Sequence, residues 1–361
     1  MTPTPALQQQ RHRQVLAEVV RAYIETGEPV SSRTIARVHA EPLSSATMRN
    51  IMADLEDEGY LYQPHTSAGR VPTASAYRFY VEQIAAQATP RVEDRDWIRR
   101  ELESATTPEG VMERASHVLA AVSRGLGIII SPPLARTLVE HIRFLLLPDS
   151  RVLVVLVTSG GITRDKCIRP ERAFLQPELD RIAEFLNRHY PRQTLESICA
   201  DLKAQLALDR ERYEKLISGA LLLCDPKLLG EDAERVVYIG GAAQFAAAAE
   251  FQDQQQLGEL LSAIEERDRL VALLNGCIEA PEPVHVEFGV EQMSSVGKHL
   301  ALVSAPYGHG EPPRPGEPVR LGEQGTLGIL GPMRMHYERV ITVVALMSQF
   351  FSEETKGDKL S

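Results

Sequence analysis

The sequence has few cysteines and little basic charge, and both shortages exclude classes of protein. Its cysteines, Cys167, Cys199, Cys224 and Cys277, are scattered along 361 residues without a CxxC pair or a histidine at ligand spacing. We therefore expect buried free thiols rather than a zinc site or a disulfide framework. The net charge of −10 argues against a general nucleic-acid binder, although an acidic body can still carry one local basic face.

Long apolar segments and catalytic motifs are missing as well. The most apolar run, Val152–Thr158, has the length of a strand and is too short to span a bilayer. The first residues contain no apolar signal-peptide core, so we expect a cytoplasmic protein without membrane association. No GxSxG, P-loop, HExxH or GxGxxG pattern occurs, and we expect neither an enzyme nor a cofactor.

What the sequence does contain is a dense helical pattern near its N-terminus. A first amphipathic helix ends at Gly27, and Ser31 or Ser32 is placed to cap a short second helix. Ser44 is placed to cap a third helix, whose apolar face consists of Met48, Ile51, Met52 and Leu55. The predicted order is helix, short helix, tight turn, helix.

A β-hairpin is predicted directly after the third helix. Residues 60–63 and 70–71 are strand-like, and the turn between them, 64–69, is rich in turn-forming residues. Gly69 is free to take a positive φ there. A polar hairpin that follows three helices is typical of the wing in a winged helix, and a further amphipathic helix begins after Thr73.

The exposed face of the third helix is the strongest candidate for a functional surface. Arginine bonds guanine and asparagine bonds adenine, each through two hydrogen bonds, and small side chains let a helix enter the major groove. An ordinary solvated face of a small helical domain is the alternative. On the wing, polar and basic side chains can bond phosphates, and Gly69 allows close backbone approach. The predicted DNA-binding residues are Ser44, Ser45, Thr47, Arg49, Asn50, Arg33, His65, Thr66, Ser67, Gly69 and Arg70.

The rest of the chain favours an α+β sheet domain divided by a helical insertion. Strands are predicted near 127–131, 141–148, 151–169 (a hairpin), 236–240, 284–289, 300–308 and 325–331, with a mostly helical stretch over 176–260. Residues 308–319 are predicted to form an exposed, disordered loop, and a final helix carries Val340 and Val344. The expected boundaries are 1–88, 89–175, 176–260, 261–351 and a flexible tail over 352–361.

Two blocks resemble a known family. The run from Tyr23 to Thr73, above all QPHTSAGRVPT at 63–73, and the run from Gly328 to Thr342 (GILGPMRMHYERVIT) closely resemble the bacterial heat-inducible transcription repressor family HrcA. The resemblance implies a multidomain α+β protein with an N-terminal winged helix-turn-helix, a GAF-like domain and an inserted dimerisation domain. It also implies a homodimer that represses chaperonin operons by binding an inverted-repeat operator on double-stranded DNA, the CIRCE element.

The same resemblance implies that the chaperonin GroEL assists folding of the repressor, and that heat relieves repression by occupying the chaperonin. Its DNA-reading residues fall on Ser44–Asn50 and its wing on His65–Arg70. Ser31 departs from the family, which commonly has glycine at that position. Two other interpretations stay open: a ligand-sensing regulator that uses the GAF-like domain, and a winged helix that contacts another protein.

Overall fold

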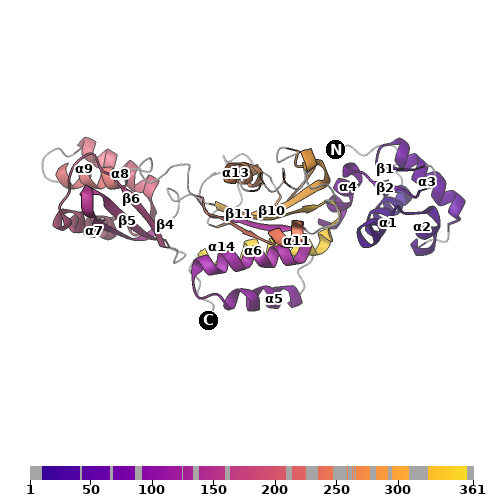
Figure 1. The fold of residues 1–361 in the computed structure, drawn as a ribbon, viewed down its shortest axis with the longest axis horizontal. Helices are drawn as coiled ribbons and strands as arrows, with labels where there is room; N and C mark the ends of the chain where they lie inside the picture. The colour runs from indigo at the N-terminus through magenta and orange to yellow at the C-terminus, as the bar shows by residue number, and fades with distance from the viewer. Residues whose placement is uncertain are drawn as a thin grey trace.

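The computed structural model of the protein describes most of the chain between residues 10 and 355. The described residues are 10–40, 43–65, 68–85, 92–123, 125–132, 138–158, 163–208, 214–224, 235–246, 258, 262, 264, 266–276, 282–291, 295–308 and 324–355. They form three bodies along the long axis of the molecule (Figure 1). We call these the head (10–85), the central body (92–132 with 235–355) and the insert (138–224).

The head contains the three helices that the sequence predicts, followed by a short hairpin and a fourth helix. Its elements are α1 (Gln10–Thr26), α2 (Ser32–Val38), α3 (Ser45–Asp57), β1 (Leu61–Tyr62), β2 (Val71–Pro72) and α4 (Ala74–Ala85). The apolar positions of α1 and α3 interleave to form the core, where Leu16, Met48 and Leu55 are fully buried. The predicted helical period of both helices is therefore confirmed.

The central body is an antiparallel five-stranded sheet in the order β8-β3-β11-β10-β9. Its strands are β3 (Leu126–Ile130), β8 (Val237–Gly240), β9 (His285–Phe288), β10 (Leu300–Gly308) and β11 (Gln324–Pro332). Its helices are α5 (Val92–Glu103), α6 (Pro108–Ser123), α11 (Ala242–Ala246), α13 (Arg267–Asn275) and α14 (Tyr337–Thr355), with a 3-10 turn at Ser295–His299. Helices α6 and α14 cover one face, with α5 outside them, and α13 covers the other (Figure 1).

The insert has a second sheet, in the order β6-β5-β4-β7. Its elements are β4 (Leu138–Leu146), a 3-10 turn (Pro148–Ser150), β5 (Val152–Thr158), β6 (Thr163–Ile168), α7 (Gln176–His189), β7 (Gln193–Thr194), α8 (Leu195–Leu208) and α9 (Glu214–Leu223). Alternate residues of β4 and β5, among them Phe144 and Val154, turn inward onto these helices and form a separate core. The predicted hairpin of β5 and β6 is confirmed.

The boundaries of the insert differ from the sequence-based ones. Strands β4, β5 and β6 were expected in the central sheet but pair with one another and with β7, so the insert begins before β4 rather than at 176 and is not purely helical. Strand β8, expected within the 176–260 insertion, pairs with β3 in the central sheet. An alternating apolar pattern identifies a strand but does not say which sheet it joins, which explains both differences.

Two predictions near the C-terminus meet the limits of the described residues. The exposed loop predicted over 308–319 begins at Gly308, the last residue of β10, and its remainder lies outside the described residues. Residues 352–355, which were predicted to belong to a flexible tail, instead form the end of α14, which continues to Thr355. Residues 356–361 are outside the description.

Candidate nucleic-acid interface

Helix α3 presents the polar face that the sequence predicts. The hydroxyl of Ser44 caps the helix by accepting a hydrogen bond from the backbone N–H of Thr47 at 3.1 Å. Met48, Ile51, Met52 and Leu55 are buried on one side, which turns the opposite side to solvent. Exposed there are Ser44, Ser45, Ala46, Thr47, Arg49 and Asn50. The structure therefore places the five α3 candidates together on one accessible surface.

Helix α2 contributes cations beside this face and packs against α3. Ser31, not Ser32, caps α2, because its hydroxyl accepts from the backbone N–H of Thr34 at 3.1 Å. Arg33 and Arg37 are both exposed. Neither α2 nor α3 carries an acidic residue in its first turn, so the partial positive charge of both helix N-termini is left available to an anion.

Two histidine–carboxylate contacts hold α1 against the rest of the head. His39 Nδ1 lies 2.9 Å from Glu18 Oε2, and the His39 side chain is 1% exposed. His12 Nε2 lies 3.4 Å from Asp54 Oδ2 on α3. These contacts join α1 to α3 and to the residue that ends α2, and they give Glu18 and Asp54 partners within the head.

The hairpin is present with two residues in each strand: the first strand is shorter than the predicted 60–63, and the second is shifted by one residue from the predicted 70–71. At its tip the backbone N–H of Ala68 donates to the carbonyl of His65 at 2.8 Å, and the Gln63 amide donates to the carbonyl of Ala68 at 2.8 Å. His65 is exposed. Thr66 and Ser67 lie outside the described residues, so their predicted phosphate contacts remain predictions.

Gly69 has a different role from the predicted one. It is not among the glycines with positive φ. A Cβ at this position would lie 2.4 Å from the carbonyl oxygen of Val30 and 2.5 Å from that of Pro29. Glycine is therefore required because the hairpin runs directly against the segment between α1 and α2, and the close backbone approach is made within the head.

Arg70 is also engaged within the head. Its backbone pairs with Val30 through two hydrogen bonds of 2.8 and 2.9 Å. Its guanidinium Nη2 lies 2.7 Å from Glu56 Oε2, and the Arg70 side chain is 18% exposed. Arg70 follows Gly69 on the loop side of β2, as predicted, but its side chain is held by Glu56, and this ion pair ties the hairpin to α3.

Two residues near the interface were not singled out from the sequence. Gln63 supports the tip through its amide, and nothing in the local pattern predicts a bond between a side chain and a backbone carbonyl across the turn. Tyr62 on β1 is 48% exposed, next to the buried Leu61. The alternation of buried Leu61 and exposed Tyr62 is the signal that identifies Tyr62 as an outward aromatic group of the hairpin.

Elsewhere the described residues contain no cluster of three or more histidine, cysteine or acidic side chains able to hold a metal ion. Cys199 and Cys224 are buried as expected, but Cys167 is exposed on β6; Cys277 lies outside the described residues. Burial raises the pKa of the Cys224 thiol far above its usual range. Among the described helices, none is both long and apolar enough to cross a membrane.

Comparison with known proteins covers nearly the whole chain. Residues 109–341 match the family model described as the HrcA protein C-terminal domain. The heat-inducible transcription repressor HrcA of Geobacter sulfurreducens is 33% identical over 350 residues, which cover 97% of this chain and 98% of that protein. Its counterpart in Xanthomonas euvesicatoria pv. vesicatoria is 35% identical, with 92% of each chain covered.

A solved structure supports the fold independently of these names. A crystal structure of a hypothetical protein at 2.2 Å resolution aligns over 97% of this chain and 99% of that one, with a TM-score of 0.60 and 24% identity. Both sequence blocks that resembled HrcA lie in the aligned length of the relatives, and the family model extends through most of the second one. The chain belongs to the HrcA family of heat-inducible transcription repressors.

Proposed function

We propose that this protein represses heat-shock genes by binding an inverted-repeat operator of the CIRCE type as a homodimer, through a winged helix-turn-helix in the head. One observation carries the proposal: the capped helix α3 buries its apolar face and exposes Arg49, Asn50 and small residues on the other. The names of the relatives, all heat-inducible transcription repressors, support the same function.

In this proposal α3 is the recognition helix. Arg49 and Asn50 carry the side chains that read guanine and adenine through paired hydrogen bonds in the major groove. Ser45 and Ala46, being small, let the N-terminal half of the helix approach the base edges. Arg33 and Arg37, both exposed on α2, bind flanking phosphates and set the register of the helix on the duplex.

The insert is the proposed dimerisation module. The face of its sheet opposite the helices carries apolar residues on neighbouring strands: Leu145 of β4 is 43% exposed, and it pairs across the ladder with the half-buried Leu153 of β5. Val155 and Val157 continue the same face of β5. An inverted repeat presents two half-sites related by a two-fold axis, and a homodimer presents two heads with the same symmetry.

We further propose that chaperonin-assisted folding sets the amount of active repressor, and that the central body is GAF-like. The topology supports slow folding, because β3, formed from 126–130, pairs with β11, formed from 324–332. Contacts so distant in sequence form slowly and leave apolar strands uncovered in the meantime. Refolding with chaperonin and ATP is expected to raise the yield of operator-binding protein several-fold over spontaneous refolding at equal concentration.

A gel-shift titration tests the DNA interface. The probes are a duplex with a CIRCE-type inverted repeat and a scrambled duplex of equal composition. Arg49→Ala and Asn50→Ala are each expected to cost about 1–3 kcal/mol of specific binding while leaving the melting temperature unchanged. Arg99→Ala, which removes an exposed arginine from α5, is the matched control. Unchanged operator affinity in the Arg49/Asn50 double variant contradicts the assignment of α3 as the recognition helix.

A ligand-sensing regulator is the second candidate, and one observation favours it. The hydroxyls of Ser304 on β10 and Thr326 on β11 are fully buried, and neither has a hydrogen-bond partner among the described residues. In the ladder of β10 and β11, Ser304 pairs with Gly328 and Thr326 pairs with Pro306, so the two residues lie two positions apart along neighbouring strands. A thermal-shift screen with nucleotides and metabolites separates the two functions: stabilisation by a metabolite that also releases DNA favours the sensor.

A further inference from the structure

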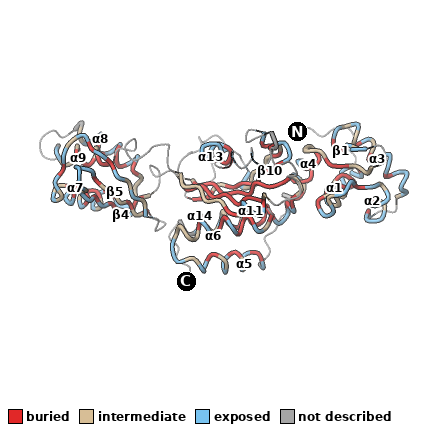
Figure 2. The backbone as a smooth tube through the Cα atoms, in the orientation of Figure 1, coloured by how far each residue is buried: buried red, intermediate tan, exposed pale blue. Residues whose placement is uncertain are grey.

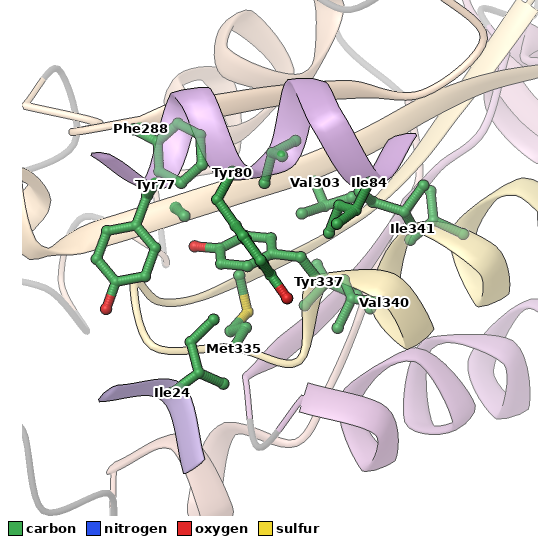
Figure 3. Packing of buried hydrophobic residues seen from close by; sticks show 14 of the residues in the cluster. Ile24, Tyr77, Tyr80, Ile84, Phe288, Val303, Met335, Tyr337, Val340 and Ile341 are labelled. Atoms are coloured by element: carbon green, nitrogen blue, oxygen red, sulfur yellow. The ribbon is translucent and has the colours of Figure 1, made fainter. Parts of the chain in front are cut away.

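The two sequence blocks that resemble HrcA meet in space, where the head joins the central body. The turn and first residues of α14, Met333–Arg339, contact helices α1 and α4 of the head and strand β9 (Figure 3). We call this contact the joint. Its centre is aromatic: the ring centroid of Tyr77 lies 6.1 Å from those of both Phe288 and Tyr337, which are 5.6 Å apart.

The aromatic centre is rigidly held. Tyr77 is 2% exposed and Tyr337 is 1% exposed, and the Tyr337 hydroxyl donates to the carbonyl of Met333 at 2.5 Å. Ile24 of α1 and Ile84 of α4 reach the same cluster from the head (Figure 3). Rings packed in such a cluster have few alternative arrangements, because interiors are as dense as organic crystals.

Polar contacts surround this aromatic centre, and they are made by Glu338 and Arg339, two consecutive residues in the first turn of α14. Glu338 Oε1 lies 3.4 Å from the Tyr80 hydroxyl and 3.7 Å from Arg21 Nη2, which links α14 to α4 and α1. A hydrogen bond between Arg21 and Tyr80 raises the pKa of the Arg21 guanidinium. Arg339 Nε lies 3.4 Å from Asp94 Oδ1, so the next residue of the turn links α5.

One head residue is shaped for this contact. Gly27, which follows α1, has a φ of +72°, and a Cβ there would lie 2.7 Å from Nη1 of Arg334. The guanidinium of Arg334 therefore lies against bare backbone at the end of α1. Arg334, Tyr337 and Glu338 contact the head at α1, at the residue that follows it and at α4, whereas Arg339 links α14 to α5 within the central body. The head is thus attached by shape and packing over several points.

We propose that the Met333–Arg339 turn is the positioning element that fixes the orientation of the DNA-reading head for a two-half-site operator. This inference rests on the proposed function. Both heads of a dimer gain affinity from an inverted repeat only when their separation and angle match it. A fixed joint supplies that match before binding, and Tyr77, Tyr337 and Glu338 act as positioning residues that touch no DNA.

The DNA experiment compares one half-site with the whole repeat. Tyr77→Leu and the double variant Arg21→Ala/Glu338→Ala are titrated against a half-site duplex, the intact CIRCE-type repeat, and repeats whose spacer is changed by one to three base pairs. Half-site affinity is expected to stay within about twofold of the parent protein, while affinity for the intact repeat falls roughly tenfold for Tyr77→Leu and roughly threefold for the polar pair. In these variants the head is less firmly oriented, so we also expect smaller differences in affinity between repeats of different spacer length.

The matched control is Arg114→Ala/Glu101→Ala. This pair lies inside the central body with an N–O distance of 3.7 Å, the same as between Arg21 and Glu338, and with similarly exposed side chains. Its removal is expected to leave the dependence of operator affinity on spacer length, which we call the spacer profile, unchanged. Equal losses for the half-site and the whole repeat in the joint variants overturn the positioning role, because they indicate damage to the reading surface.

A distance measurement tests the joint without DNA. Spin labels are attached at Asp57→Cys on α3 and Glu113→Cys on α6, both exposed, in a Cys167→Ser/Cys277→Ser background diluted with unlabelled protein. We expect a narrow distance distribution in the parent and a broader one in the joint variants. If the parent binds none of the duplexes, the proposed function fails while this measurement still decides the joint. Unchanged distributions and an unchanged spacer profile in the variants refute the joint.

Discussion

The head and the insert are attached to the central body in different ways. The head shares one continuous hydrophobic core with the central sheet, from Leu16 of α1 through Tyr77 to Met347 of α14. The insert has its own core, which contains Phe144 and Leu186 and includes no residue of the head or central body. Figure 2 shows these buried regions as separate blocks. A shared core fixes orientation, whereas a separate core makes a module.

Two substitutions that create cavities, one in the shared core and one in the insert core, give the largest expected effects. Tyr337→Ala in the shared core and Phe144→Ala in the insert each cost about 3–5 kcal/mol of stability, since both rings are almost fully buried. We expect Tyr337→Ala to increase amide hydrogen exchange in both the head and the central body. Phe144→Ala should increase it in the insert alone. Exchange that spreads into the head from Phe144→Ala contradicts the modular insert.

Removal of the insert sharpens the same comparison. Its two ends are adjacent, because the backbone N–H of Ser131 donates to the carbonyl of Val236 at 3.0 Å and that of Val236 donates to the Ser131 hydroxyl at 2.9 Å. We expect excision of 133–234 with a short linker to leave a folded monomer. Operator affinity should fall about a hundredfold, with half-site affinity retained. Sedimentation that shows an intact dimer moves the dimer interface out of the insert.

Substitution of Arg70 tests whether its ion pair with Glu56 stabilises the head rather than binds DNA. Replacing it with alanine removes the 2.7 Å contact and leaves Glu56 without this partner, at a cost of about 1–2 kcal/mol in thermal or urea unfolding. The salt dependence of DNA binding should keep its slope, because Arg70 is engaged within the head. Arg33→Ala is the counterpart: it should reduce the slope by about one unit and leave stability unchanged. If Arg70→Ala instead reduces the slope and leaves stability unchanged, Arg70 contacts DNA.

The smallest expected effect is a pH dependence confined to the insert. A hydrogen bond of 2.8 Å from Arg172 lowers the pKa of the Glu178 carboxyl. A depressed pKa in the folded state contributes stability above the ordinary glutamate value of about 4.3, and this contribution is lost as pH falls through the folded value. Because the pair is partly exposed, we expect less than about 1 kcal/mol. Glu178→Gln should reduce the loss of insert stability at acid pH, measured as its free energy of unfolding, and leave the stability of the head unchanged.

Features that depend on local chemistry could be predicted from the sequence. The buried face of α3, with Met48 and Leu55, follows from its helical period, and the Ser44 cap follows from residue type. Pairings between distant elements could not be predicted. Arg70 looked like a hairpin-tip cation because its partner, Glu56, belongs to another element. The limits of the insert were misplaced for the same reason, since the partners of β4 and β8 are chosen by tertiary packing.

The place of β3 in the central sheet has a consequence during synthesis on the ribosome. This strand emerges early, yet its neighbours β8 and β11 are encoded far downstream, with the whole insert between β3 and β8. At about 5–20 residues per second, roughly two hundred further residues require about 10–40 s before β11 can pair. Ile128, Ile129 and Ile130, which are fully buried in the finished fold, have no partner strand until β8 is made, and they lack the β11 partner throughout that interval. The nascent chain therefore carries β3 without its β11 partner for about half of its translation time.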